Sequence, residues 1–142
     1  MIFKPTTVFP APVVRLADFI RDLLDVAHVP ADVTCHSLCR GLLPVLKDLG
    51  FKVQLHDGYF GPHSAAHSWL TEQEHPSYIV DPYPWACQQY PLVVCAETLS
   101  PWSYIYRSGD EYLERCLRNL IPAEAAAIEK ELRRLKCAPS RL

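Results

Sequence analysis

Three residues of the sequence, Cys35, His67 and Asp81, have the types and the spacing that catalysis by a thiol nucleophile requires. In such a site a cysteine attacks as its thiolate, a histidine carries the proton, and a carboxylate orients the imidazole ring. The chain has six cysteines. Cys35 is the best candidate because it is expected to open a helix, where unpaired N–H groups and the helix dipole favour a thiolate. Cys39, one turn further on, gains less from the dipole.

His67 and Asp81 are expected to face each other across a β-hairpin. Residues 65–71 and 77–81 are predicted strands, with a polar loop between them. If the hairpin is centred on Glu74, His67 lies directly opposite Asp81, with Cβ atoms about 4.5–5.5 Å apart. At that separation the carboxylate can accept a hydrogen bond from the imidazole and stabilise its charged form. The hairpin therefore predicts the base and its orienting residue.

Hydrophobic periodicity indicates the elements that must position these side chains. Helices are expected at 13–27, at 35–49, from a capping box at 108–111 to about residue 120, and at 122–136. Apolar and polar residues alternate over 51–56, which is typical of a half-buried strand, and weaker strands are expected near 92–95 and 103–107. Asp57-Gly58 is expected to form a turn, and Pro44 to kink or split its helix. The order of helices, strands and helices predicts an α+β fold with a mostly antiparallel sheet.

Composition narrows the class of protein. A length of 142 residues predicts a single domain over 1–142, and a net charge of -2 argues against a strongly basic nucleic-acid binder. No apolar run approaches the ~20 residues that cross a bilayer. The cysteines form no CxxC pair, so we expect no metal site. No signal peptide is apparent, which favours a cytoplasmic location and free thiols, although export as an effector stays open.

From Cys35 to Pro82, about a third of the chain, the sequence resembles the core of the transglutaminase-like superfamily, a circularly rearranged relative of the papain-like cysteine enzymes. The shared pattern is a cysteine opening a helix, a glycine closing it, a strand with Gly-Tyr, His-x-Trp on the next strand and Asp-Pro on the third. Here these are Cys35, Gly50, Gly58-Tyr59, His67-Ser68-Trp69 and Asp81-Pro82. The segment 78–81 also resembles arylamine N-acetyltransferases, which share the Cys-His-Asp core. No tryptophan precedes Cys35, so the indole that supports the oxyanion in animal transglutaminases has no counterpart.

The resemblance implies a papain-like fold, with a core motif at 35–82 and a helical tail at about 108–137. It also implies a cysteine-dependent hydrolase of amides or acyl groups: a peptidase, amidase or deamidase. Cys35 would form a thioester, His67 would act as base and Asp81 would orient it. Small stand-alone members include peptidases that remove leader segments from modified peptides. A peptide or protein substrate is therefore favoured over a small amine, and the chemistry needs no cofactor.

Two alternatives to hydrolysis stay open at this point. One is an acyltransferase of the transglutaminase or arylamine N-acetyltransferase type, and the other is a transglutaminase-like binding module without turnover. Trp69, Tyr59 and Trp85 are candidates for substrate contact, although packing is the ordinary role for such aromatics. His36, about 100° around the helix from Cys35, is expected at the surface or at the rim of a pocket.

Overall fold

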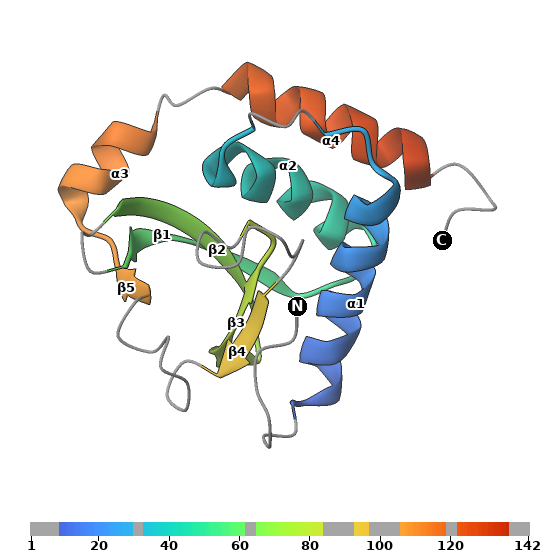
Figure 1. Ribbon diagram of the computed structural model, residues 1–142, viewed down its shortest axis with the longest axis horizontal. Coiled ribbons are helices and arrows are strands. Elements are labelled where there is room, and N and C mark those ends of the chain that lie inside the picture. The colour runs from blue at the N-terminus through green and yellow to red at the C-terminus, as the bar shows by residue number, and fades with distance from the viewer. Residues whose placement is uncertain are drawn as a thin grey trace.

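An antiparallel sheet and a layer of helices meet in one hydrophobic core (Figure 1). The computed structural model describes residues 9–29, 33–61, 65–83, 93–96, 106–118 and 122–136. The helices are α1 (Ala11–Val26), α2 (Cys35–Asp48), α3 (Glu111–Arg118) and α4 (Pro122–Lys136). The strands are β1 (Val53–Phe60), β2 (Ala65–Glu72), β3 (His75–Asp81), β4 (Val93–Ala96) and β5 (Tyr106–Ser108). Their order in the sheet is β4-β3-β2-β1-β5, and all neighbours are antiparallel. The expected α+β class is confirmed.

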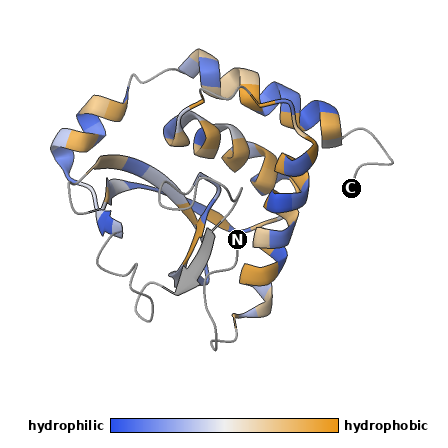
Figure 2. Cartoon of the chain, in the orientation of Figure 1, coloured by the Kyte–Doolittle hydropathy of each residue, from blue (hydrophilic) through white to orange (hydrophobic). Residues whose placement is uncertain are grey.

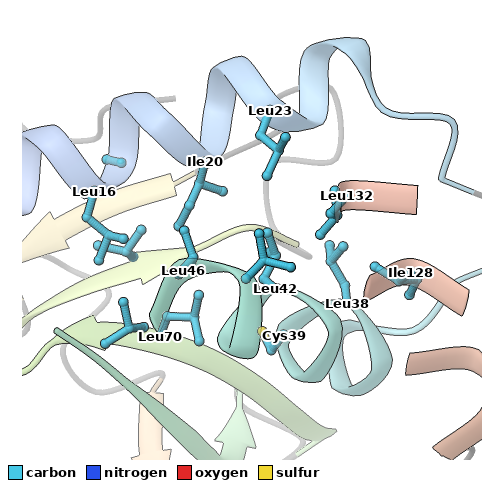
Figure 3. Close-up of a cluster of buried hydrophobic side chains, with 14 of the residues drawn as sticks. Leu16, Ile20, Leu23, Leu38, Cys39, Leu42, Leu46, Leu70, Ile128 and Leu132 are labelled. Atoms are coloured by element: carbon cyan, nitrogen blue, oxygen red, sulfur yellow. The ribbon is translucent and has the colours of Figure 1, made fainter. Parts of the chain in front are cut away.

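The core lies between the sheet and the helices α1, α2 and α4. Helix α2 packs on β1 and β2, α1 packs on β2 and β3, and α4 covers the outer side of α2 (Figure 1). Each of these helices carries apolar and polar residues on different sides (Figure 2). The apolar side chains at helical spacing interlock in the core, as drawn in Figure 3 for Leu16, Ile20, Leu42, Leu46 and Leu132. Helix α2, which begins at Cys35, is thus enclosed on two sides.

The limits of α2 follow from local chemistry at its two ends. Thr34 is the N-cap, and its side-chain oxygen accepts a hydrogen bond of 3.2 Å from the backbone N–H of Ser37. At the other end Gly50 adopts a φ of 92°, which is a conformation that favours glycine, and Phe51 N–H donates to the carbonyl of Leu46 at 3.0 Å. Both ends lie where the sequence places them, so Cys35 is the first residue of the helix.

Of the kink or split expected at Pro44, the split does not occur, because α2 runs without interruption from Cys35 to Asp48. Proline removes one backbone hydrogen bond, here the bond to the carbonyl of Arg40. The loss is offset by burial of the helix on both sides, where four apolar side chains are at most 4% exposed: Leu38, Leu42, Val45 and Leu46.

Helix α4 packs closely on α2, and two of its acidic side chains hold the segment that leads into α2. A Cβ at Gly41 would lie 2.6 Å from Cγ2 of Ile128, so the two helices approach as closely as only glycine permits. Glu124 accepts a hydrogen bond of 3.3 Å from the backbone N–H of Thr34, the residue before Cys35. Glu131 accepts another, of 2.9 Å, from the backbone N–H of His28. Helix α4 thereby fixes the chain between α1 and α2, just before Cys35.

The substitution Gly41→Ala is expected to destabilise the fold by about 1–3 kcal/mol, because the added methyl group overpacks the contact with Ile128. Urea unfolding followed by circular dichroism measures this change. Lys47→Ala, on the exposed part of the same helix, is the matched control and should stay within about 0.5 kcal/mol. An unchanged midpoint for Gly41→Ala would show that α4 does not pack on α2 in solution.

The turn expected at Asp57-Gly58 is wrong, because both residues continue β1. Gly58 pairs with His67 on one side and with Ser108 on the other. A Cβ at Gly58 would collide with the carbonyl oxygen of Arg107 and lie 2.6 Å from the ring of Trp69. The glycine therefore serves close approach within the sheet rather than a change of direction.

The hairpin of β2 and β3 is confirmed, but its expected register is wrong by two residues. Centring on Glu74 also places Trp69 opposite Ile79, whereas the structure pairs Thr71 with Ile79 and Leu70 with Val80. An irregularity between Thr71 and Glu72 produces this shift. Because side chains alternate with a period of two, a shift by two keeps every side chain on its expected face. The pairing of His67 with Asp81 becomes diagonal and is not lost.

The capping box expected at 108–111 is corrected in part, because Asp110 and not Ser108 caps α3. Asp110 Oδ1 accepts hydrogen bonds of 2.9 Å from the backbone N–H of Leu113 and from the hydroxyl of Tyr59. Ser108 still belongs to β5, so the chain cannot begin its helix there. Helix α4 forms as expected, with its stripe of Ile128, Leu132 and Leu135 buried.

Candidate active site

The hairpin brings His67 and Asp81 into direct contact. Nε2 of His67 lies 2.7 Å from Oδ2 of Asp81, and both side chains are 0% exposed. Two further donors hold the carboxylate: the Tyr106 hydroxyl reaches Oδ2 at 2.6 Å, and the Tyr83 backbone N–H reaches Oδ1 at 2.8 Å. These donors fix the orientation of Asp81, which in turn fixes the imidazole ring of His67.

Cys35, in the first turn of α2, contacts His67 of this pair. Its side chain is 1% exposed and forms hydrogen bonds with the side chains of His36 and His67. Burial by itself raises the pKa of the Cys35 thiol. The two hydrogen bonds and the positive charge of the two rings outweigh burial and lower this pKa from 9.0 to about 6. The helix N-terminus acts in the same direction, because its free N–H groups attract a thiolate.

The pKa of His67 moves in the opposite direction. Burial lowers it, but the charge of Asp81, the hydrogen bond to Asp81 and the contact with Cys35 together raise it from 6.5 to about 9. Between about pH 6 and pH 9, Cys35 is therefore a thiolate and His67 is an imidazolium. Such an ion pair is the resting state that a thiol nucleophile and a general acid require.

The second buried cysteine of the helix lacks this activation. Cys39 is 0% exposed, and burial together with the negative charges of Asp81 and Cys35 raises its pKa well above 9.0. Cys39 therefore stays a neutral thiol among the core side chains (Figure 3). Cys116 is exposed on α3, away from the site.

The sequence predicts His36 at the surface or at the rim of a pocket. This is wrong, because the side chain is buried against the sheet. Its Nδ1 lies 2.6 Å from Oγ of Ser68, and Ser68 donates to Oδ1 of Asp57 at 2.5 Å. Arg40 donates to Oδ2 of Asp57 at 2.7 Å and to the backbone carbonyl of His36 at 3.2 Å. Sequence reasoning missed this network. The available signal was Ser68, a polar residue two positions before the apolar Leu70 and therefore on the same, core-facing side of the strand.

The structure places the three expected substrate residues differently. Trp69 is buried and stacks between two imidazoles, with ring centroids 6.1 Å from His67 and 5.9 Å from His56. Tyr59 lies away from the thiol, where its hydroxyl bonds to Asp110. Trp85 lies outside the described residues. Of the two that the structure describes, Trp69 contacts the candidate site and Tyr59 does not.

A cleft of about 630 Å³ opens beside this stack of rings. Its walls come from β1, β2 and the start of α3, and include Leu55, His56, Asp57, Trp69, Asp110 and Glu114. Neither Cys35 nor His67 lines it. The cleft therefore reaches the candidate site indirectly, through the ring of Trp69 and through Asp57.

Within the described ranges, no three His, Cys, Asp or Glu side chains gather in a way that could hold a metal ion. The helices in those ranges are too short or too polar to cross a membrane. Comparison of the chain with protein-family models, with curated proteins and with solved structures finds no match in any of the three.

Proposed function

We propose that the chain is a cysteine-dependent hydrolase of amides or acyl groups, built on a transglutaminase-like core. The observation that carries this proposal is the contact of Cys35 with His67, whose ring is held by Asp81 at 2.7 Å. A thiolate and an imidazolium at the N-terminus of a buried helix form a nucleophile and a general acid. Strongly shifted pKa values of neighbouring titratable groups are concentrated at functional sites, which supports this proposal.

The chemistry begins with attack of the Cys35 thiolate on the carbonyl carbon of an amide. A C–S bond forms, and the charge that develops on the oxygen is stabilised by backbone N–H groups at the start of α2, that of Cys35 first among them. His67 gives its Nδ1 proton to the departing nitrogen, because Nε2 is committed to Asp81. The C–N bond breaks and leaves an acyl group on Cys35. Water then releases the acid and restores the thiolate.

Two glycines of the motif support the family resemblance on physical grounds. Gly50 closes the helix at a φ of 92°, and Gly58 leaves space for the Trp69 ring that packs on His67. The spacing of the motif thus corresponds to requirements of the fold and not only to residue type. A peptide or protein substrate remains the preferred class, with leader-peptide removal as a possible subclass.

Access to the thiol limits the choice of a first probe. Cys35 is 1% exposed, so a bulky substrate reaches it only after neighbouring groups move. A small alkylating reagent needs less space, and it reports the thiolate without knowledge of the natural substrate. Alkylation therefore tests the activated nucleophile separately from the identity of the substrate.

In an iodoacetamide series over pH, we expect Cys35 to react at a rate that rises through about pH 6 and reaches a plateau well below pH 9. Below pH 6 the thiol is protonated and slow, so the sign of the change is fixed by the lowered pKa of Cys35. Peptide mapping by mass spectrometry identifies the modified cysteine. Cys116 is the exposed internal reference, and Cys39 is expected to stay unmodified in the folded chain.

Two results of this series would contradict the proposal. One is modification of Cys116 at every pH while Cys35 stays unreactive, and the other is an onset for Cys35 near its ordinary value of 9.0. Products then separate the remaining classes. Incorporation of an added amine into an acyl acceptor would indicate an acyltransferase, and a reactive Cys35 without any turnover would indicate a binding module.

A further inference from the structure

A line of hydrogen bonds joins the wall of the cleft to the thiol. Asp57, in β1, lines the cleft, and its side chain is 27% exposed. Its Oδ1 accepts a hydrogen bond of 2.5 Å from Ser68, whose Oγ lies 2.6 Å from Nδ1 of His36. His36 in turn forms a hydrogen bond with Cys35. Residues of β1, β2 and α2 are thus connected in one line that ends at the candidate nucleophile.

The members of this line are held in place on both sides. The Arg40 guanidinium donates to Oδ2 of Asp57 at 2.7 Å, which leaves Oδ1 turned to Ser68. The side chains of Ser68 and His36 are buried, so water competes little for their contact. Because a hydroxyl group can donate or accept, Ser68 holds the Nδ1 edge of the ring in either tautomer. The orientation of His36 therefore depends on the sheet and not on α2 alone.

The direction of the last contact follows from its effect on the thiol. The hydrogen bond with His36 lowers the pKa of the Cys35 thiol. The ring therefore presents an N–H to the sulfur, because only a donor favours the charged form. An N–H donates well only when it points at its acceptor. A ring that turns away would withdraw this donor and leave Cys35 with His67 as its remaining imidazole partner.

We propose that Ser68 and Asp57 are positioning residues for the nucleophile, which hold the His36 ring where its N–H stabilises the Cys35 thiolate. The inference rests on the proposed function, because it concerns the same thiolate. In the proposed reaction His67 remains the proton carrier, whereas His36 acts on the resting nucleophile. The reactivity of the buried thiol is thereby set in part by a carboxylate at the wall of the cleft.

The sign of the expected change separates this line from a direct effect of charge. Asp57 is negatively charged, and removing a negative charge by itself would lower the pKa of a nearby thiol. Loss of the His36 donor raises the pKa of Cys35 instead. Four other titratable groups of this region keep their identity in the variants: His67, Asp81, Cys39 and Arg40.

Alkylation of Cys35 by iodoacetamide over pH tests the proposal. In Ser68→Ala and in Asp57→Ala we expect the onset for Cys35 to move upward by about one pH unit, which slows the reaction at about pH 5 by roughly tenfold. The rate at the high-pH plateau should change little, because the thiolate is fully formed there in every variant. Asp22→Ala, which removes an exposed carboxylate paired with Arg21, is the matched control.

A double-mutant cycle shows whether the residues act in one line. Asp57→Ala should add no further shift in a chain that already carries Ser68→Ala, and neither substitution should shift the onset in a His36→Leu chain. Ser68→Thr keeps the hydroxyl group and should keep the onset near that of the wild type. Cys39 is the internal reporter of folding, because its buried thiol stays unmodified while the core is intact.

The possible outcomes distinguish this inference from the proposed function. Additive shifts in the cycle, a downward shift in Asp57→Ala, or an onset near 6 in every variant would overturn the inference and leave the proposed function intact. An onset near 9.0 in the wild-type chain would overturn the proposed function itself.

Discussion

Replacing Cys35 by alanine is expected to lower acylation and ester hydrolysis by at least roughly 10⁴-fold, because the thiolate that His67 and the start of α2 stabilise is then missing. Cys39 lies one turn away, yet burial and two neighbouring negative charges raise its pKa well above 9.0 and keep it a thiol. Proximity alone therefore cannot let Cys39 replace Cys35. The measurement is the burst of p-nitrophenolate released from p-nitrophenyl acetate. The intact mass of the protein records the acyl group directly.

The matched control for this loss is Cys116→Ala, which removes an exposed thiol on α3 and should leave the burst unchanged. Unfolding in urea should show that Cys35→Ala remains folded, since the small buried side chain loses only its sulfur. Full activity in Cys35→Ala would place the nucleophile elsewhere and remove the basis for the proposed function.

Asp81→Asn is the second substitution with a large expected effect. The amide keeps the shape of the side chain but lacks the charge that raises the pKa of His67. This pKa should fall, so the imidazolium is lost at a lower pH and the Cys35 thiolate loses its partner. The pH window of the ion pair, about 6 to 9 in the wild type, should narrow from both sides. We expect the acylation rate near neutral pH to drop by roughly 10²–10⁴-fold.

Stability provides an independent measure of the same contact. The folded pKa of His67 lies above its unfolded value of 6.5, so the contribution of the pair is complete below about pH 6.5 and is lost as pH rises through about 9. The loss in Asp81→Asn should therefore be larger near pH 6 than near pH 10 and reach about 1–3 kcal/mol. Asp48→Asn, which loses an exposed ion pair with Arg133, is the control. Equal losses at both pH values would contradict the charged contact.

The contact of His67 with Asp81 could be predicted from the sequence because it depends on the parity of the strand and not on the register. The register was wrong by two residues, but a shift by two returns both side chains to the same face. The placement of Cys35 rested on short-range chemistry, the Thr34 cap and the left-handed Gly50. Features that depend on neighbours within a few residues can therefore be predicted from the sequence.

The features that the sequence did not predict depend on contacts between segments that lie far apart in the chain. Tyr106 reaches Asp81 only because β5 pairs with β1, across 46 residues from Phe60, and no local pattern announces that pairing. The buried position of His36 depends on its hydrogen bond with Ser68, which is a contact between a helix and a strand. The Asp57-Gly58 turn failed for the same reason, since pairing on both sides of β1 outweighs the turn preference of the two residues.

The position of α4 determines which residues would have to be transferred together if residues 35–82 were moved to another protein. Residues 35–82 hold the whole Cys-His-Asp motif and look like a module that protein engineers could graft onto another scaffold. Two contacts that position the start of this segment nevertheless come from α4: Glu124 accepts a hydrogen bond from Thr34, the residue just before the segment, and Ile128 lies against Gly41. A graft limited to residues 35–82 would contain Cys35, His67 and Asp81. It would lack α4, the helix that positions the start of α2. The minimal transferable unit therefore has to be discontinuous, with the last helix brought along.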